Sequence, residues 1–387
     1  MKYRWTLLLL VVSTGLMVGC VANHDSRKRT GVVALSQELR TLQLRFAPDR
    51  HLSVYTLGLD QAGGGLVLTG EVDRAEARIE TLQAVGQLGV EVADQIRVLP
   101  DATQGETNWG ITTLSVANGR EGTAHSAELG TQTLMGEVVR VLKRQGRWLY
   151  VQSSDQYLSW MESGSLKLCT RKEVDAWEHS PLLFVTDFDV LICETPAREA
   201  QPVSDVVIGC RVKKLGETDG YFKVELPDGR SGFLSKSFAT DYATWKGSRR
   251  PTPENIERTG RRLLGRPYLW GANTPRGLDC SGFTKLTYLL NGLELRRNAS
   301  QQAGQGVEIP LDPDFSQLKK GDLLFFGFEE RGDRPGRISH VGIYLGDKLF
   351  IQASQRVRLS SLDPKSPIAD FGRIRGLIKA RRVLPAN

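Results

Sequence analysis

The stretch that most constrains the fold runs from Tyr268 to Gly282 and reads YLWGANTPRGLDCSG. Directly before its cysteine it contains four turn-forming residues: Gly271, Asn273, Pro275 and Gly277. The letters that follow, FTKLTYLL, repeat apolar residues at helical spacing and predict a buried helix. Cys280 is therefore predicted at a helix N-terminus, where the positive end of the helix dipole favours the thiolate. A cysteine placed in this way is a candidate nucleophile.

A cysteine nucleophile needs a base, and only one of the five histidines follows Cys280. His340 lies in ISHVGIYLGD, which predicts a strand closed by a Gly-Asp turn, and the next predicted strand, KLFIQAS, carries Gln352. A cysteine on a helix, a histidine on one strand and an amide on the next form a papain-like arrangement, in which the third group orients the base. The alternative is that Cys280 is an inert buried thiol. We interpret the other four histidines as ordinary surface or core residues.

Five ordered segments within residues 252–385 resemble the NlpC-type papain-like cysteine peptidases, which cut the peptides of bacterial cell walls. The segments are PYLWGA, LDCSGF, RNASQQ, KKGDLLFF and SHVGIYLGD. The resemblance implies Cys280 as nucleophile, His340 as base and Gln352 as the orienter of the base. Many family members carry histidine at the third position, so glutamine is a departure. Tyr268 resembles a family tyrosine whose hydroxyl helps to bind the oxyanion, beside the backbone N–H of the nucleophile.

The remaining segments predict an α+β protein made of several small domains. Residues 31–101 read as helix, strand, strand, helix and strand, with Ala75, Ile79, Leu82 and Val85 on one apolar face of the second helix. They loosely resemble the BON domain of envelope proteins. This domain is interpreted as a spacer or a binding module. Residues 109–168 and residues 180–240 each contain short strands broken by turn residues, and both resemble bacterial SH3-like barrels. The NlpC-type domain, residues 252–385, follows them.

NlpC-type peptidases with tandem SH3-like domains use the first barrel as a wall of the substrate cleft. The resemblance implies that a glutamate and a tyrosine of that barrel recognise the free amine of the substrate, and the matching positions are Glu128 and Tyr157. We predict Glu128 to be a buried carboxylate opposite an ammonium, the alternative being a solvated surface acid. Asp279 and Ser281 are predicted to line the same pocket. Asn298 stands where such relatives often carry aspartate, so Glu128 and Asp279 have to supply the negative charge.

The first 20 residues predict a secretory signal, with a basic start, an apolar run and the ending MVGC. The ending resembles a bacterial lipobox, which implies that Cys20 is lipidated and anchors the chain to a membrane. In Gram-negative lipoproteins this implies the outer membrane, facing the periplasm. The alternatives are a plain signal peptide and a membrane anchor, for which the run is short. Residues 21–30 are polar and are predicted to form a tether.

Charge and cysteine content limit the partners and cofactors. The net charge of +7 is a mild excess, compatible with attraction to an anionic wall or membrane, and no motif points to nucleic acid. Export permits disulfides, and at most one pair can form among Cys169, Cys193 and Cys210. These cysteines lack the paired spacing of metal ligands, so no metal site is predicted. A thiolate mechanism needs no cofactor.

The resemblance therefore implies an endopeptidase that hydrolyses the bond between γ-D-glutamate and a diamino acid in peptidoglycan peptides. It further implies released fragments with a free N-terminal L-Ala as substrates, and it leaves the diamino acid undefined. One alternative is a wall-binding adaptor with an inactive peptidase domain, which the intact Cys280 and His340 disfavour. The other is an amidase or acyltransferase on the same scaffold, which the tandem barrels disfavour.

Overall fold

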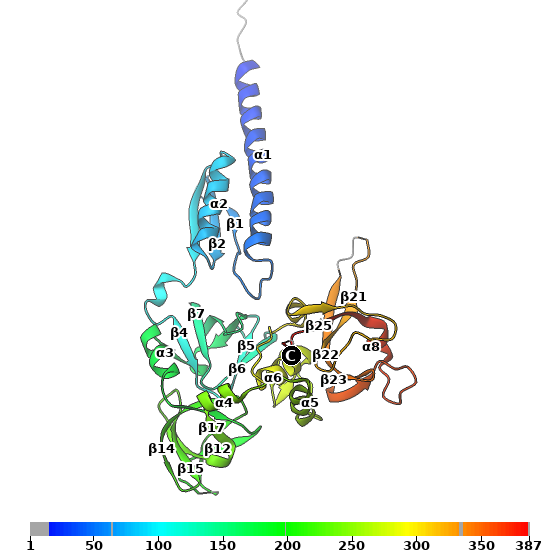
Figure 1. The fold of residues 1–387 in the computed structure, drawn as a ribbon. Helices are drawn as coiled ribbons and strands as arrows, with labels where there is room; N and C mark the ends of the chain where they lie inside the picture. The colour runs from blue at the N-terminus through cyan, green and yellow to red at the C-terminus, as the bar shows by residue number, and fades with distance from the viewer. Residues whose placement is uncertain (1–14, 63–64, 198, 333–335, 386–387) are drawn as a thin grey trace, which may run out of the picture. The chain divides into compact units, whose positions relative to one another are not determined.

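The computed structural model describes residues 15–62, 65–197, 199–332 and 336–385, and of residues 15–30 only the backbone (Figure 1). The chain divides into two compact units, Met1–Asp101 and Ala102–Asn387. Most of the predicted signal, residues 1–14, lies outside the described residues. Within the described residues, none of the helices combines the length and the apolar character that crossing a membrane requires.

The first unit contains a three-stranded sheet and two long helices. Its elements are α1 (Gly15–Phe46), β1 (Gly58–Ala62), β2 (Gly65–Val72), α2 (Ala75–Gln87) and β3 (Val92–Val98). Strand β2 pairs antiparallel with β1 and parallel with β3, and α2 makes the crossover that a parallel pair needs. The order of elements is the one predicted, whereas the BON-like identity stays a prediction.

Two predictions for this unit are wrong. The expected tether at residues 21–30 is helical backbone within α1. On α2, Ile79 was expected in the core but is 52% exposed, and Thr81 is buried in its place. The Thr81 hydroxyl donates to the carbonyl oxygen of Ala77 at 2.7 Å and lies 2.8 Å from the Tyr55 hydroxyl. A threonine whose hydrogen bonds are satisfied can occupy a core position. A prediction from apolar residues alone therefore selects Ile79 rather than Thr81 as the buried residue.

The second unit begins with two seven-stranded antiparallel sheets. The first has the order β10-β4-β7-β8-β9-β5-β6 and consists of β4 (Trp109–Thr112), β5 (Val116–Arg120), β6 (Leu129–Leu134), β7 (Val138–Gln145), β8 (Trp148–Gln152), β9 (Leu158–Glu162) and β10 (Leu166–Cys169). Helix α3 (Arg171–Glu178) follows it. The second has the order β13-β12-β16-β15-β14-β11-β17 and consists of β11 (Leu182–Val185), β12 (Val190–Cys193), β13 (Pro202–Val206), β14 (Arg211–Thr218), β15 (Tyr221–Glu225), β16 (Ser231–Ser235) and β17 (Ala239–Asp241). Short 3-10 turns lie at Ala102–Gln104, Ser163–Ser165 and Lys236–Phe238.

The two barrels are joined by packing rather than by disulfides. Leu134 and Met135 of the first barrel belong to the apolar core of the second. Cys169, Cys193 and Cys210 are buried free thiols, so the pair that the sequence allowed does not form in the structure. The Cys210 thiol donates to a backbone carbonyl at 3.3 Å, and burial raises its pKa to about 12.

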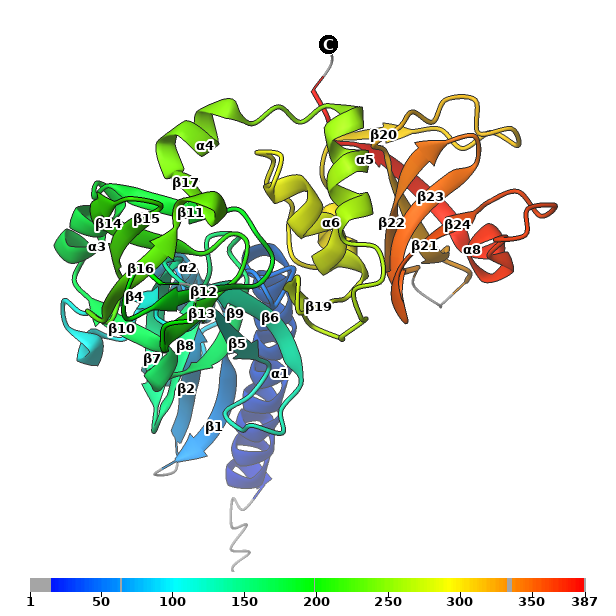
Figure 2. The ribbon, with the colours of Figure 1, turned by 90° about the horizontal axis from the view of Figure 1, so that it is seen from below.

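The C-terminal part of the second unit has a six-stranded sheet with the order β20-β25-β21-β22-β23-β24. Its helices are α4 (Tyr242–Ser248), α5 (Pro253–Arg262), α6 (Cys280–Leu289), α7 (Ala299–Gln302) and α8 (Phe371–Gly376). Its strands are β18 (Asn273–Thr274), β19 (Gly277–Leu278), β20 (Val307–Ile309), β21 (Leu323–Phe328), β22 (Arg337–Gly346), β23 (Leu349–Ser354), β24 (Arg356–Ser361) and β25 (Leu377–Arg382). Helix α6 packs against β22 and β23 (Figure 2). Because Cys280 begins α6, and His340 and Gln352 lie on β22 and β23, this packing assembles the predicted site.

Candidate active site

The N-terminus of α6 is fixed by the turn that precedes it. Asp279 caps the helix, and its carboxylate accepts from the backbone N–H of Gly282 at 2.7 Å. The same carboxylate accepts from the backbone N–H of Gly271 at 3.0 Å. A Cβ at position 282 would collide with the carbonyl oxygen of Ala272, so the turn can lie this close to the helix only over a glycine. The local sequence DCSG thus places Cys280 at the first helical position.

His340 is held by Gln352 from the neighbouring strand. The imidazole Nε2 lies 2.6 Å from the Gln352 Oε1. The Gln352 amide nitrogen donates to the Ser360 hydroxyl at 2.8 Å and to the Asp370 carboxylate at 3.0 Å, so the amide oxygen faces the imidazole. Nε2 is therefore the protonated nitrogen, and Nδ1 is left as the basic one.

Burial favours the neutral forms of both Cys280 and His340 in the substrate-free protein. Burial and the negative charge of Asp279 raise the pKa of the Cys280 thiol to about 11, although the backbone N–H groups of Val341 and Ser281 favour the thiolate. Burial and the positive charge of Arg373 lower the pKa of His340 to about 3. Burial thus opposes the effect of the helix end, which favours the thiolate as the sequence predicts. The thiol proton has to move to the imidazole when the sulfur attacks.

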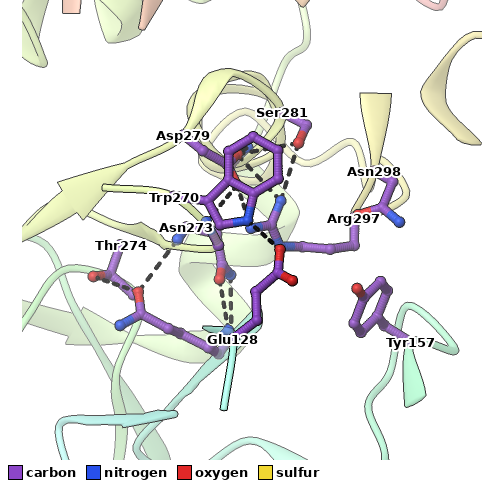
Figure 3. Close-up of polar contacts among 12 residues, drawn as sticks. Glu128, Tyr157, Trp270, Asn273, Thr274, Asp279, Ser281, Arg297 and Asn298 are labelled. Atoms are coloured by element: carbon purple, nitrogen blue, oxygen red, sulfur yellow. Dashed lines mark hydrogen bonds and ion pairs between the residues drawn. The ribbon is translucent and has the colours of Figure 1, made fainter. Parts of the chain in front are cut away.

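A buried ion pair joins Arg297 to Asp279, the residue that precedes the nucleophile (Figure 3). Arg297 is 1% exposed, and its guanidinium lies 2.6 Å from the Asp279 carboxylate and 3.0 Å from the Ser281 hydroxyl. The Ser281 hydroxyl donates to the same carboxylate at 3.1 Å. The charge of Asp279 is thus already compensated, which conflicts with the prediction that it supplies negative charge to a substrate amine. Sequence reasoning missed Arg297, although a buried acid beside a nucleophile requires a counter-charge.

The first barrel contributes acids and a tyrosine to the same region. Glu128 is exposed rather than buried as predicted, and it accepts from the indole N–H of Trp270 at 2.5 Å. Tyr157 is buried and donates to the carboxylate of Glu121 at 3.0 Å. Burial and the negative charge of Glu121 raise the pKa of Tyr157, to which the Asn298 side chain also hydrogen-bonds. Figure 3 shows Tyr157 and Asn298 beside Arg297. Glu121 is therefore the acid that contacts Tyr157, and sequence reasoning missed it.

Tyr268 lies near the nucleophile. Its side chain is half-buried, and its backbone N–H donates to the carbonyl oxygen of Gln355 at 2.8 Å, which fixes the segment. Burial raises the pKa of Tyr268, and the neighbouring Asp279 carboxylate adds to this effect. The hydroxyl therefore stays protonated and able to donate.

Hydrogen bonds and an ion pair tie the barrel to the catalytic domain. Gln132 and Asn273 exchange backbone and side-chain hydrogen bonds, with distances of 2.7 Å and 3.0 Å. Lys285 of α6 lies 2.8 Å from the buried Asp155 carboxylate, which also accepts from the backbone N–H of Tyr157 at 3.1 Å. Because α6 carries both Lys285 and the nucleophile, this ion pair fixes the Tyr157 loop relative to the catalytic helix.

No group of three or more histidine, cysteine, aspartate or glutamate side chains within the described ranges has the geometry to hold a metal ion.

Comparison with known proteins agrees with this architecture. Residues 265–373 match the NlpC/P60 family, and residues 120–166 match the bacterial dipeptidyl-peptidase Sh3 domain. A γ-D-glutamyl-L-lysine dipeptidyl-peptidase of Bacillus cereus is 28% identical over 295 residues, which cover 74% of this chain and 85% of that protein. Its namesake in Bacillus subtilis is 34% identical over 228 residues, which cover 56% of this chain and 69% of that protein. The crystal structure of an NlpC/P60 family protein from Bacillus cereus, 26% identical, matches with a TM-score of 0.60 and covers 72% of this chain and all of that one.

The fold and these relatives define a cysteine peptidase. The chain belongs to the NlpC/P60 family. The resemblance predicted from the five ordered segments is thereby confirmed, as is the combination of an NlpC-type domain with an SH3-like barrel.

The buried His340 makes stability depend on pH. Its pKa is about 3 in the folded protein and near the ordinary 6.5 in the unfolded chain, so the unfolded chain takes up the proton first as the pH falls. This contribution is lost as the pH falls below 6.5, by about 2 kcal/mol between pH 7 and pH 5. We expect urea unfolding of a His340→Asn variant to show a shallower loss of unfolding free energy over this range than the wild type. Identical pH dependence in the two proteins would contradict the buried, neutral histidine.

Proposed function

We propose that this protein is an endopeptidase that cleaves between γ-D-glutamate and a diamino acid in peptidoglycan peptides. The observation that carries the proposal is the combination, in one compact unit, of the NlpC/P60 domain with a barrel that matches the dipeptidyl-peptidase Sh3 domain. The names of the two Bacillus relatives support the same bond specificity. The inactive-adaptor alternative is disfavoured, because the thiol and the imidazole are both present and adjacent elements carry them.

The proposed reaction uses four residues. The Cys280 sulfur attacks the γ-carbonyl while His340 Nδ1 takes the thiol proton, and His340 then protonates the leaving amine. Gln352 keeps the imidazole in the required tautomer, as its 2.6 Å contact supports. The backbone N–H of Cys280 and the Tyr268 hydroxyl stabilise the oxyanion. Water then hydrolyses the thioester and releases the γ-D-glutamyl product.

We further propose that the barrel selects peptides with a free N-terminal amine. Because Arg297 compensates Asp279 and position 298 is a neutral asparagine, the negative charge for an ammonium has to come from the barrel. Glu121 and Glu128 are the acids available there, one bonded to Tyr157 and the other to Trp270. Peptides still joined to glycan lack this ammonium, so the enzyme acts on released fragments.

The location of the protein is also a proposal. The sequence ending MVGC supports lipidation of Cys20, which would anchor the protein in the cell envelope, at the outer membrane facing the periplasm. This position would bring it to the peptides that wall turnover releases.

The proposed reaction is tested with two substrates. Wild-type protein should cleave free L-Ala-γ-D-Glu-diamino acid tripeptide and leave intact sacculi uncut, with fragments identified by mass spectrometry. A Cys280→Ala variant should fold, as circular dichroism can check, and should cleave neither. Cleavage by the folded variant would remove Cys280 from the mechanism, and equal cleavage of both substrates by the wild type would remove the selection for released fragments.

The recognition of the amine is tested on the barrel acids. Glu121→Gln and Glu128→Gln should each reduce kcat/KM for the free tripeptide by about 1–3 kcal/mol, the range for a lost charge-assisted contact. Glu106→Gln, at an exposed acid just before the first strand of the barrel, is the control and should leave kcat/KM unchanged. If neither barrel variant differs from this control, the ammonium is bound elsewhere.

The anchor is tested by removing the thiol that carries the lipid. A Cys20→Ser variant expressed in a Gram-negative bacterium should move from the membrane fraction to the soluble periplasmic fraction, because lipid attachment requires the thiol. Mass spectrometry of the wild-type N-terminus is expected to find acyl chains. A Cys20→Ser protein that stays lipid-modified in the membrane would show that the lipobox interpretation is wrong.

A further inference from the structure

An arginine lies beside the proposed base that the reaction described so far does not use. Arg373 of α8 donates from Nε to the Gln352 Oε1 at 3.2 Å, the same oxygen that lies 2.6 Å from His340. Its guanidinium carbon lies 5.5 Å from the centroid of the Phe326 ring, and that ring lies 5.8 Å from the His340 ring. A positive charge is therefore held one side chain away from the group that protonates the leaving amine.

This charge has no carboxylate partner of its own. In the described residues, no Asp or Glu oxygen lies within the 4.0 Å of an ion pair with the Arg373 guanidinium. The acid nearest in the network is Asp370, whose Oδ2 accepts from Arg358 and from the Gln352 amide, each at 3.0 Å. Its Oδ1 accepts from the backbone N–H of Arg373 at 3.1 Å. The Arg358 guanidinium thus has a carboxylate partner and the Arg373 guanidinium has none, so the cluster has an excess of positive charge.

Because Arg373 is half-buried, the lack of a carboxylate partner for its guanidinium is energetically costly. The Arg373 side chain is half-buried, and burial lowers its pKa, as is expected for a cation that has left water without close compensation. Guanidinium groups in such places bind carboxylates through paired N–H donors. Arg375 of the same helix is exposed, so water can hydrate its guanidinium.

The proposed reaction indicates on which side of the scissile bond the Arg373 guanidinium lies. His340 delivers a proton to the leaving amine, so the leaving diamino acid lies on the His340 side of the scissile bond. Gln352 contacts the far nitrogen of that imidazole, and Arg373 contacts Gln352. Arg373 is therefore on the leaving-group side. A diamino acid carries its main-chain carboxylate one carbon away from the nitrogen that leaves. Diaminopimelate carries a second carboxylate on its side chain, where lysine has none.

We propose that Arg373 binds a carboxylate of the leaving diamino acid and so selects the substrate at its leaving-group end. The proposal rests on the proposed function, because it assumes cleavage at a diamino acid. A carboxylate there completes the charge balance of the Arg358–Asp370–Arg373 cluster. The carboxylate is either the main-chain group of a C-terminal diamino acid or the side-chain group of diaminopimelate, and the two are distinguished by the choice of substrate.

The test uses three tripeptides that share L-Ala-γ-D-Glu and end in L-lysine, in L-lysine amide, or in diaminopimelate with its main-chain carboxylate amidated. Comparing lysine with lysine amide isolates the main-chain carboxylate, and comparing the two amides isolates the side-chain carboxylate. Wild-type protein should prefer at least one carboxylate-bearing leaving group over lysine amide by about 10- to 100-fold in kcat/KM, the range of a charge-assisted contact. Cleavage of any of the three establishes the proposed reaction independently of this preference.

Two variants then assign the preference to Arg373. Arg373→Gln should lose it, with kcat/KM falling by a larger factor for the preferred substrate than for lysine amide and with KM rising for the preferred substrate. Arg375→Gln, the matched control in the same helix, should keep it, and Arg373→Lys, which retains the charge, should keep part of it. Equal wild-type rates on all three peptides would overturn the proposal, as would an Arg373→Gln variant whose kcat falls equally on all three, because that marks a residue that only positions Gln352. No wild-type cleavage of any peptide would overturn the proposed function, and this proposal with it.

Discussion

The buried ion pair between Asp279 and Arg297 is the interaction on which the catalytic centre depends. The Asp279 carboxylate caps α6, holds the backbone of Gly271 and contacts Ser281, so one side chain fixes the turn, the helix and the nucleophile between them. Arg297 brings the start of α7 to the same point. Removing one partner of a buried pair typically costs about 3–5 kcal/mol, because the remaining charge is left uncompensated. The pair therefore provides a rigid framework, and it is not available to the substrate.

The catalytic domain and the first barrel contribute different groups to the candidate site. The catalytic domain supplies a thiol and an imidazole whose neutral forms are favoured by burial. The barrel supplies the carboxylates of Glu121 and Glu128 and the buried Tyr157. Lys285 joins the two, because it lies on the helix of the nucleophile and pairs with Asp155 of the barrel. The Lys285–Asp155 ion pair therefore fixes the position of the barrel relative to the catalytic helix.

What could be predicted from the sequence follows from the range of the interactions involved. Cys280 at a helix start and Gln352 on the strand after His340 follow from local periodicity, and the structure has both. The partners Arg297 and Glu121 could not be found in this way, because their contacts are decided by folding rather than by neighbouring letters. The effect of burial on the Cys280 thiol could not be predicted for the same reason, since the helix dipole is local and burial is a tertiary effect. In the first unit, Thr81 shows that a satisfied polar residue can take a core position that an apolar count assigns elsewhere.

We propose that the barrel recognises the free ammonium of the substrate while the catalytic domain cleaves the γ-glutamyl bond. The most direct measurement compares kcat/KM of the wild-type protein for free L-Ala-γ-D-Glu-diamino acid tripeptide and for the same tripeptide acetylated on its N-terminal amine. Acetylation removes only the positive charge and its hydrogen-bond donors, so the account predicts a loss of about 10- to 100-fold, the range expected for a charge-assisted contact. Equal values for the two peptides would contradict it.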